Sequence, residues 1–216
     1  MSKFRIGAEA WNNRFLGDGW AYGKEPNEWL KIRIQPGNRK ALVPADGEGR
    51  NAVYIASLGY ETTVFDLSDV GKSKCAILAK EKSVQVDYQV DDIATRDFKN
   101  EYYDLIACSW FHIPWELFTI HYPRMLKSLK PGGEFICEGY HTSQLELNSG
   151  GPKSLDLLWD LDEVMDVISD GFDVIHAEVE SIELDESDLH RGSARVVRIH
   201  LRLSLIHISE PTRRRT

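Results

Sequence analysis

One segment constrains the fold of this chain more than any other. An apolar run that starts at Ala41 ends in the loop Gly47-Glu-Gly49, and a helical pattern follows at once. A second apolar run, residues 62–65, ends in Asp66. A strand, a glycine-containing loop, a helix and a second strand ending in an acid form a unit that binds nucleotides. Glycines let a ligand approach the backbone, and the acid can accept hydrogen bonds from both hydroxyls of a ribose.

The rest of the chain alternates helical and strand patterns. The terminal segments 172–184 and 194–203 alternate polar and apolar residues, which predicts a long hairpin. The expected class is therefore α/β: a Rossmann-like, mostly parallel sheet of seven strands with an antiparallel terminal strand and helices on both faces. Helices are expected over 8–16, 26–32, 50–58, 69–82 and 114–129, with one helix or two short ones within 154–169, and strands over 40–45, 61–65, 84–90, 103–109 and 134–140.

Composition excludes several functional classes. The chain has 216 residues, a net charge of −8 and a pI of about 5.4. An acidic chain is a poor partner for nucleic acid, because phosphate backbones recruit basic faces. The three cysteines have neither metal-binding nor redox spacing, so reduced thiols are expected. With no membrane-length apolar run and no apolar leader, we expect a cytoplasmic protein with no membrane contact, either a monomer or a homodimer, acting on a small-molecule substrate.

Four features together resemble the class I S-adenosylmethionine-dependent methyltransferases. They are the loop Asp46–Asn51, the strand-end acid Asp66, the turn Leu129–Gly133 and the terminal hairpin. The resemblance implies S-adenosyl-L-methionine as cofactor, S-adenosyl-L-homocysteine as product, and methyl transfer by in-line displacement. Such a reaction needs alignment and a partly desolvated site, so no metal is expected.

The amino-terminal segments narrow the resemblance. Residues 11–15 and 22–27, together with Gln144–Pro152, are similar to the branch of tellurite-resistance and thiopurine methyltransferases. This branch implies a small-molecule acceptor with a soft sulfur, selenium or tellurium atom; halide, oxygen and nitrogen acceptors stay open. It also implies that residues 1–36 form an amino-terminal cap over the cofactor site. We expect residues 1–203 to form one methyltransferase domain.

The loop departs from the family pattern at two positions. Val43 stands where the family usually has an acid, and Ala45 stands where it has the first glycine. Asp46 comes three positions late for the usual acid. Backbone carbonyls near Ala45 are then expected to hold the amino group of the cofactor.

The resemblance implies a set of cofactor-binding residues. Asp66 would bind the ribose, and Asp92, with Asp91 as the alternative, would meet the adenine. Arg14 can hold a carboxylate by bidentate hydrogen bonds. The full set is Arg14, Tyr22, Ala45, Asp46, Gly47, Gly49, Asn51, Asp66, Leu67, Asp92, Ile93 and Ser109.

A second set would face the methyl acceptor. His112 follows the fourth strand and is the candidate general base, because the pKa of a histidine lies near neutrality. A thiolate or selenide needs little or no base, so the catalytic residues stay open. The acidic run 178–188 is interpreted as a solvated hairpin edge and tip. The substrate-side residues are Trp20, Trp110, His112, Tyr140, His141 and Gln144.

Two other functions compete, and one segment is set aside. The loop and Asp66 also fit the fingerprint of an NAD(P)-dependent oxidoreductase, although the antiparallel ending argues against it. Val43 and Ala45 motivate a non-catalytic S-adenosylmethionine-binding module. Residues 204–216 carry three consecutive arginines before the final threonine and resemble a translated sequencing-adapter read. They are expected to be a non-native tail, with a natural basic tail as the alternative.

Overall fold

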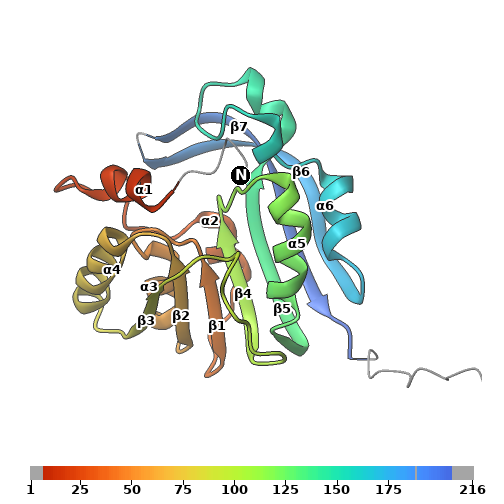
Figure 1. The fold of residues 1–216 in the computed structure, drawn as a ribbon, viewed down its shortest axis with the longest axis horizontal. Coiled ribbons are helices and arrows are strands. Elements are labelled where there is room, and N and C mark those ends of the chain that lie inside the picture. The colour runs from red at the N-terminus through yellow and green to blue at the C-terminus, as the bar shows by residue number, and fades with distance from the viewer. Residues whose placement is uncertain (1–6, 188, 206–216) are drawn as a thin grey trace, which may run out of the picture.

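A twisted sheet of seven strands, in the order β3-β2-β1-β4-β5-β7-β6, forms the centre of the molecule (Figure 1). The computed structural model describes residues 7–187 and 189–205. The strands β1 to β5 are parallel, whereas β7 is antiparallel to both β5 and β6. The expected α/β class and its antiparallel strand are confirmed. The strands are β1 (Lys40–Pro44), β2 (Glu61–Asp66), β3 (Val86–Val90), β4 (Tyr103–Ser109), β5 (Leu129–Tyr140), β6 (Phe172–Ser187) and β7 (His190–Leu203).

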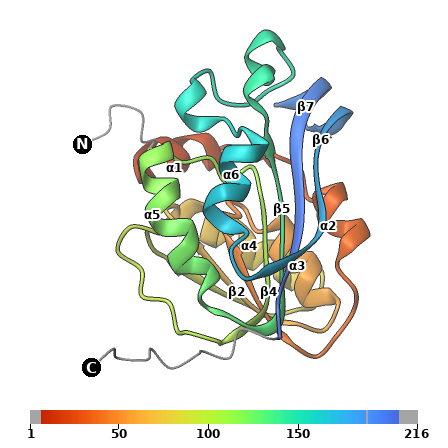
Figure 2. The same ribbon diagram turned by 90° about the vertical axis from the view of Figure 1, so that its right-hand side faces the viewer.

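Helices cover both faces of the sheet (Figures 1 and 2). One face packs against α2, α3 and α4, and the other against α5 and α6. The first helix, α1, lies beyond the carboxyl ends of the strands, next to α4 (Figure 1). The helices are α1 (Ala8–Phe15), α2 (Glu28–Arg33), α3 (Arg50–Ser57), α4 (Asp69–Glu81), α5 (Trp115–Leu126) and α6 (Leu161–Ile168).

The central strands are buried on both faces. In β1, Leu42 packs on the α5 and α6 side, whereas Ala41 and Val43 pack on the α2, α3 and α4 side. Ile106 and Leu105 divide β4 in the same way. A strand covered on both faces has no polar side, which is why β1 appears in the sequence as a continuous apolar run.

The terminal hairpin is longer than the sequence pattern predicted. β6 and β7 stay paired up to Ser187 and His190, whereas the prediction stopped at residues 184 and 194. In this stretch the side chains of Glu186 and His190 are largely buried and contact each other, whereas Asp185 and Arg191 pair at the surface. The hairpin rises past the end of the sheet and reaches the side of the molecule where α1 lies (Figure 1).

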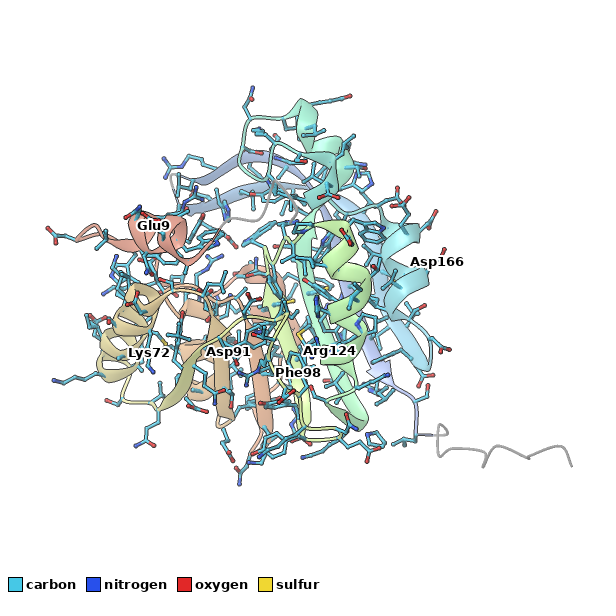
Figure 3. The ribbon with its side chains drawn as sticks, viewed as in Figure 1. Glu9, Lys72, Asp91, Phe98, Arg124 and Asp166 are labelled. Atoms are coloured by element: carbon cyan, nitrogen blue, oxygen red, sulfur yellow. The ribbon has the colours of Figure 1, made fainter. Side chains whose placement is uncertain are left out.

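One smaller expectation needs correction. The predicted turn at residues 130–133 lies inside β5 as an irregularity: Leu129 pairs with Tyr103, and the pairing with β4 resumes at Glu134. Within 154–169, where one helix or two short ones were expected, the structure has two short elements: a 3₁₀ turn at Leu155–Leu157 and α6. Figure 3 labels Asp91 and Phe98 on the irregular segment that joins β3 to β4.

The expected cap consists of α1, a glycine-containing loop and α2 within the described residues. The expected non-native tail falls, after residue 205, outside the described residues. Within residues 7–187 and 189–205, no helix combines the length and apolar character needed to cross a membrane.

Candidate active site

The loop between β1 and α3 curls sharply at the carboxyl end of the sheet. Ala45, Gly47 and Gly49 all have positive φ angles, of 52°, 54° and 89°. A left-handed conformation costs a residue with a Cβ roughly 1–2 kcal/mol, so Ala45 holds strained backbone where a glycine would not. At Gly49 a Cβ would lie 2.3 Å from the Cys75 sulfur of α4. The loop therefore packs on α4 with no room for a side chain there.

Asp46 stabilises the start of α3. Its carboxylate accepts hydrogen bonds from the Asn51 side-chain amide and the Ala52 backbone N–H, both at 2.7 Å. The N-cap residue, Gly49, has no side chain to do this. Burial raises the pKa of Asp46 to about 7, against these two hydrogen bonds. Both carboxylate oxygens of Asp46 are thus used at the start of α3, and a cofactor would compete with these hydrogen bonds for them.

Asp66 lies directly beside the loop. One carboxylate oxygen accepts the Gly47 N–H and the other accepts the Ser68 N–H, each at 2.9 Å. Burial raises the pKa of Asp66. Each oxygen keeps a second lone pair, so the carboxylate can still accept hydrogen bonds from two hydroxyls. From the other side, the Tyr88 hydroxyl donates to the Gly47 carbonyl at 2.7 Å.

The cap lies over this loop. Phe15 of α1 is 2% exposed, and its ring packs so closely on Gly47 that a Cβ there would come within 2.9 Å. Asn12 accepts a hydrogen bond from the Ser68 hydroxyl at 2.6 Å. The helix α1 therefore covers both Gly47 and the region beside Asp66.

The polar residues of the loop motif hold the cap in place. Glu48 accepts the Ala21 N–H at 2.8 Å, and the Arg50 guanidinium donates to the Tyr22 carbonyl at 3.2 Å. The Asn51 side-chain oxygen accepts the Asn27 N–H at 2.8 Å. Sequence reasoning singled out the glycines and missed Glu48 and Arg50. Three polar side chains in four positions, at the start of a helix with a buried face, were the available signal.

Ser109 and Trp110 follow β4 on the expected acceptor side. The Ser109 hydroxyl accepts a hydrogen bond from the Asn51 amide at 3.0 Å, which joins the end of β4 to the loop. Trp110 has a φ of 59°, although it is not a glycine. Its ring stacks on Tyr140 of β5, with 4.4 Å between the centroids. Strained backbone of this kind gathers at functional sites.

His112 has both ring nitrogens engaged. Nδ1 faces the Leu157 carbonyl at 2.7 Å, so it carries the proton and donates, while Nε2 accepts the Tyr140 N–H at 3.1 Å. Burial lowers the pKa of His112 to about 4. The expected general base is therefore a neutral imidazole that joins Tyr140 to the segment around Leu157. Its geometry argues against proton abstraction.

Glu186 corrects the interpretation of the hairpin tip. Its side chain is only 13% exposed and pairs with the Arg50 guanidinium at 2.8 Å. It also accepts hydrogen bonds from the Asn27 amide at 2.9 Å and the Trp110 indole N–H at 3.2 Å, and lies 3.4 Å from the His190 ring. Burial alone would raise the pKa of Glu186, but its interactions with His190 and Arg50 lower it to about 2. The tip is thus joined to the cap, the loop and β4.

The other expected residues are placed in different surroundings. Arg14 is exposed, donates to the Tyr22 hydroxyl at 2.7 Å and lies over the Trp11 ring. Trp20 contacts Lys24 and Lys74, on the side of the cap that faces α4. Neither reaches the ends of β4 and β5 in this structure.

Gln144 and His141 mainly hold the loop that follows β5. The Gln144 amide donates to Ser149 at 2.9 Å and accepts the Arg195 N–H at 2.8 Å. Burial lowers the pKa of His141, whose Nδ1 lies 2.8 Å from the Ser143 hydroxyl.

The segment after β3 was expected to meet the adenine. Asp92 accepts the Ala94 N–H at 2.9 Å, whereas its competitor Asp91 is paired with Arg96 at 2.8 Å. Ile93 is 5% exposed and belongs to the core around Phe65. Leu67, next to Asp66, is half-buried.

The order of strands and the antiparallel β7 define the class I methyltransferase fold, and solved structures share it. A protein studied in "Conversion of a Disulfide Bond into a Thioacetal Group during Echinomycin Biosynthesis" has a TM-score of 0.71 and 15% identity, covering 92% of each chain. TehB from Haemophilus influenzae has a TM-score of 0.65 and 14% identity over 90% of this chain and 66% of its own. The N-methyltransferase NodS from Bradyrhizobium japonicum WM9 has a TM-score of 0.62 and 14% identity, over 82% and 93%.

Sequence comparison supplies the activity. Residues 42–133 match the family model of a methyltransferase domain, from β1 into β5. No curated protein sequence matches the chain. The matched segment and the shared fold indicate a methyltransferase that uses S-adenosylmethionine as its cofactor. The methyltransferase match argues against the oxidoreductase alternative.

Proposed function

We propose that the chain methylates a small-molecule soft nucleophile, with sulfur as the first candidate for the acceptor atom and selenium or tellurium next. The state of His112 carries the proposal: both ring nitrogens are engaged, and burial lowers its pKa to about 4. An alcohol or an ammonium group must lose a proton to accept a methyl group, and this histidine is not free to take it. A thiolate or selenolate attacks without that step.

The residues of the loop fit the cofactor. The carboxylate of Asp66 retains lone pairs for two ribose hydroxyls. Gly47 carries no side chain, so a ligand can reach its backbone once Phe15 moves aside. When bound, the cofactor supplies an electrophilic methyl group on a sulfonium. A lone pair of the acceptor would attack that methyl carbon in line with the breaking carbon–sulfur bond, whose electron pair would stay on sulfur. Asp66, Gly47 and the cap would therefore have to hold and align the two reactants. The leaving thioether is neutral, so no oxyanion hole is required.

The cap has the position needed to exclude water. Phe15 lies on Gly47, and Glu48, Arg50 and Asn51 hold the segment that follows. We propose that α1 moves aside to admit the cofactor and then packs over it. Water exclusion and alignment are what a methyl transfer requires of its enzyme.

A cavity between the cap and the terminal hairpin has the size of a small-molecule site. It has a volume of about 490 Å³ and lies between the cap at residues 23–28 and the hairpin at residues 182–186. Volumes of roughly 300–1,000 Å³ are typical of sites for small ligands. Arg50, Glu138 and Arg198 also line it. We propose this cavity as the access route of the acceptor.

The structural neighbours support a sulfur acceptor without fixing it. One of them comes from the conversion of a disulfide bond into a thioacetal group, and both groups are sulfur functions. NodS is described as an N-methyltransferase, so a nitrogen acceptor is the second candidate.

A screen of acceptors tests the proposal. The purified chain is incubated with S-adenosylmethionine and sulfide, 2-mercaptoethanol, 1-propanethiol, thiophenol, selenide or tellurite, alongside an amine and a phenol. We expect S-adenosylhomocysteine and a methylated product from sulfur or selenium acceptors, at least ten times faster than from the amine or the phenol. Product formation is followed by mass spectrometry.

The Asp66→Asn variant serves as control, because it keeps the size of the side chain while it removes the charge and one acceptor oxygen. It should bind the cofactor more weakly with every acceptor. Turnover confined to the amine would replace the proposal by the second candidate. Tight binding of S-adenosylhomocysteine with no turnover on any acceptor would point to the non-catalytic module.

A further inference from the structure

Tyr140 is a buried tyrosine whose hydroxyl has no hydrogen-bond partner. The residue is 1% exposed, and its oxygen is enclosed without a donor or acceptor in reach. The comparable buried tyrosines are satisfied: Tyr122 donates to the Phe111 carbonyl and Tyr88 to the Gly47 carbonyl, each at 2.7 Å. Burying a hydroxyl without a partner costs free energy, so an exception at the end of a strand that borders the site needs an explanation.

The loop after β5 fixes the ring in place. A Cβ on Gly150 would lie 2.7 Å from the Tyr140 oxygen, and a Cβ on Gly151 would lie 2.9 Å from the ring. Both glycines have positive φ angles, of 128° and 83°. Gln144 holds this loop by donating to the Gly150 carbonyl at 3.2 Å. The ring is thus clamped from one side, and its hydroxyl still gains no partner.

The opposite side of the ring belongs to the acceptor region. The Trp110 ring stacks on the Tyr140 ring with 4.4 Å between their centroids, and the centroid of the His190 ring lies 5.8 Å from that of Tyr140. His190 in turn contacts Tyr22 of the cap at 4.8 Å. Burial, and the charges of Glu186 and Glu138, raise the pKa of Tyr140. The group is therefore a phenol that can donate, not a phenolate.

The position in the sheet separates Tyr140 from the cofactor loop. Gly47 follows β1 and Asp66 ends β2, whereas Tyr140 ends β5, on the other side of β4. A molecule that meets the Tyr140 hydroxyl lies beyond Trp110, on the acceptor side. The ring of Tyr22 in the cap packs on the His190 ring, so the cap borders this region.

We propose that the Tyr140 hydroxyl donates a hydrogen bond to the methyl acceptor, at an oxygen or nitrogen atom close to the nucleophilic atom. Tyr140 then selects acceptors that carry such an atom, and the bound acceptor supplies the partner that the folded chain lacks. The inference rests on the proposed function and adds the class of acceptor: a soft nucleophile with a neighbouring hydrogen-bond acceptor.

A pair of matched thiols tests the inference. 2-Mercaptoethanol and 1-propanethiol have the same length, and only the first carries an oxygen. Because this oxygen also makes the thiol more acidic, rates are compared per thiolate present at the assay pH. We expect the wild-type chain to prefer 2-mercaptoethanol about tenfold in kcat/KM, and Tyr140→Phe to lose that preference through a higher KM. A factor of ten corresponds to about 1.4 kcal/mol. The affinity for S-adenosylhomocysteine should not change.

Stability separates this role from a structural one. Tyr140→Phe removes a hydroxyl without an internal partner, so its melting temperature should equal or exceed that of the wild type. Tyr122→Phe is the matched control: it loses the bond to Phe111 and should melt lower with its thiol preference intact.

The two hypotheses fail in different ways. A wild type that does not discriminate between the thiols, a Tyr140→Phe variant that still does, or a lower melting temperature of that variant overturns the Tyr140 inference alone. A wild type with no turnover on any soft acceptor overturns the proposed function and this inference with it.

Discussion

At the scale of single residues, Ala45 and Asp46 show how the loop after β1 keeps its conformation although it departs from the family pattern. Ala45 keeps the left-handed conformation that a glycine would adopt freely. Asp46 offsets this strain by accepting two hydrogen bonds at the start of α3. The family pattern places an acid and a glycine earlier in the loop, and here the acid sits later and faces the helix. In this loop, therefore, an alanine takes the left-handed backbone position of a glycine, and the acid stabilises the start of α3.

The raised pKa of Asp46 predicts a pH dependence of stability. In the folded chain the Asp46 carboxyl keeps its proton up to about pH 7. In the unfolded chain the same carboxyl has its ordinary pKa of 3.8 and loses the proton at much lower pH. The folded state binds more protons between these values, so the free energy of unfolding falls as pH rises from about 4 to 7, and levels off above. The slope is at most about 1.4 kcal/mol per pH unit.

Urea unfolding at several pH values measures this effect. The Asp46→Asn variant should lack the decline, so the stability difference between wild type and variant should shrink or change sign as pH rises. Asp185→Asn, at an exposed position, controls for the loss of one charge. Parallel curves for wild type and Asp46→Asn would contradict the prediction.

At the scale of elements, the cap and the glycine loop behave as one unit. Glu48 accepts the Ala21 N–H of the cap and forms a buried ion pair with Lys74 of α4, at 2.8 Å. The Lys74 ammonium also donates to the Gly19 carbonyl of the cap, at 2.6 Å. The ion pair Lys24–Glu81 joins the cap to α4 directly but is largely exposed. Exposed pairs contribute little to stability, whereas breaking a buried pair leaves an uncompensated charge. The buried connection should therefore hold the cap.

Hydrogen exchange can compare the two connections. We expect Glu48→Ala to speed the exchange of the Ala21 amide at least tenfold and to weaken the binding of S-adenosylhomocysteine. Glu81→Ala, which removes the same side chain from the exposed pair, should leave both unchanged. Equal effects of the two substitutions would show that burial does not decide which contact holds the cap.

At the scale of the whole molecule, ligand binding should be visible as thermal stabilisation. A ligand that binds only the folded state at one hundred times its Kd contributes about 2.7 kcal/mol. For a chain of this size, that raises the melting temperature by roughly 5–10 °C. S-adenosylhomocysteine should give this shift and NAD should not. A shift with NAD alone would contradict the assignment of the cofactor.

The fold was predictable because it depends on the periodicity of apolar residues and on the order of helices and strands along the chain. β1 and β4 appear as apolar runs, and the alternation in residues 172–203 marks the hairpin. The site was less predictable because its contacts join residues far apart in the chain. The partners of Glu186 lie at positions 27, 50, 110 and 190, and no local pattern distinguishes it from the acidic residues around it. His112 was correctly placed near the end of β4, but its two hydrogen bonds depend on loops whose course the sequence does not reveal.

The order of the strands also affects how the chain can be made. β6 precedes β7 along the chain, yet it reaches the sheet only through β7, which lies between β5 and β6. A nascent chain that has emerged from the ribosome only as far as β6 leaves that strand without a neighbour. Glu186 then has no fixed place, and the cap loses one of its anchors. We infer that the earlier strands can assemble during translation, while a competent enzyme forms only after β7 has been inserted.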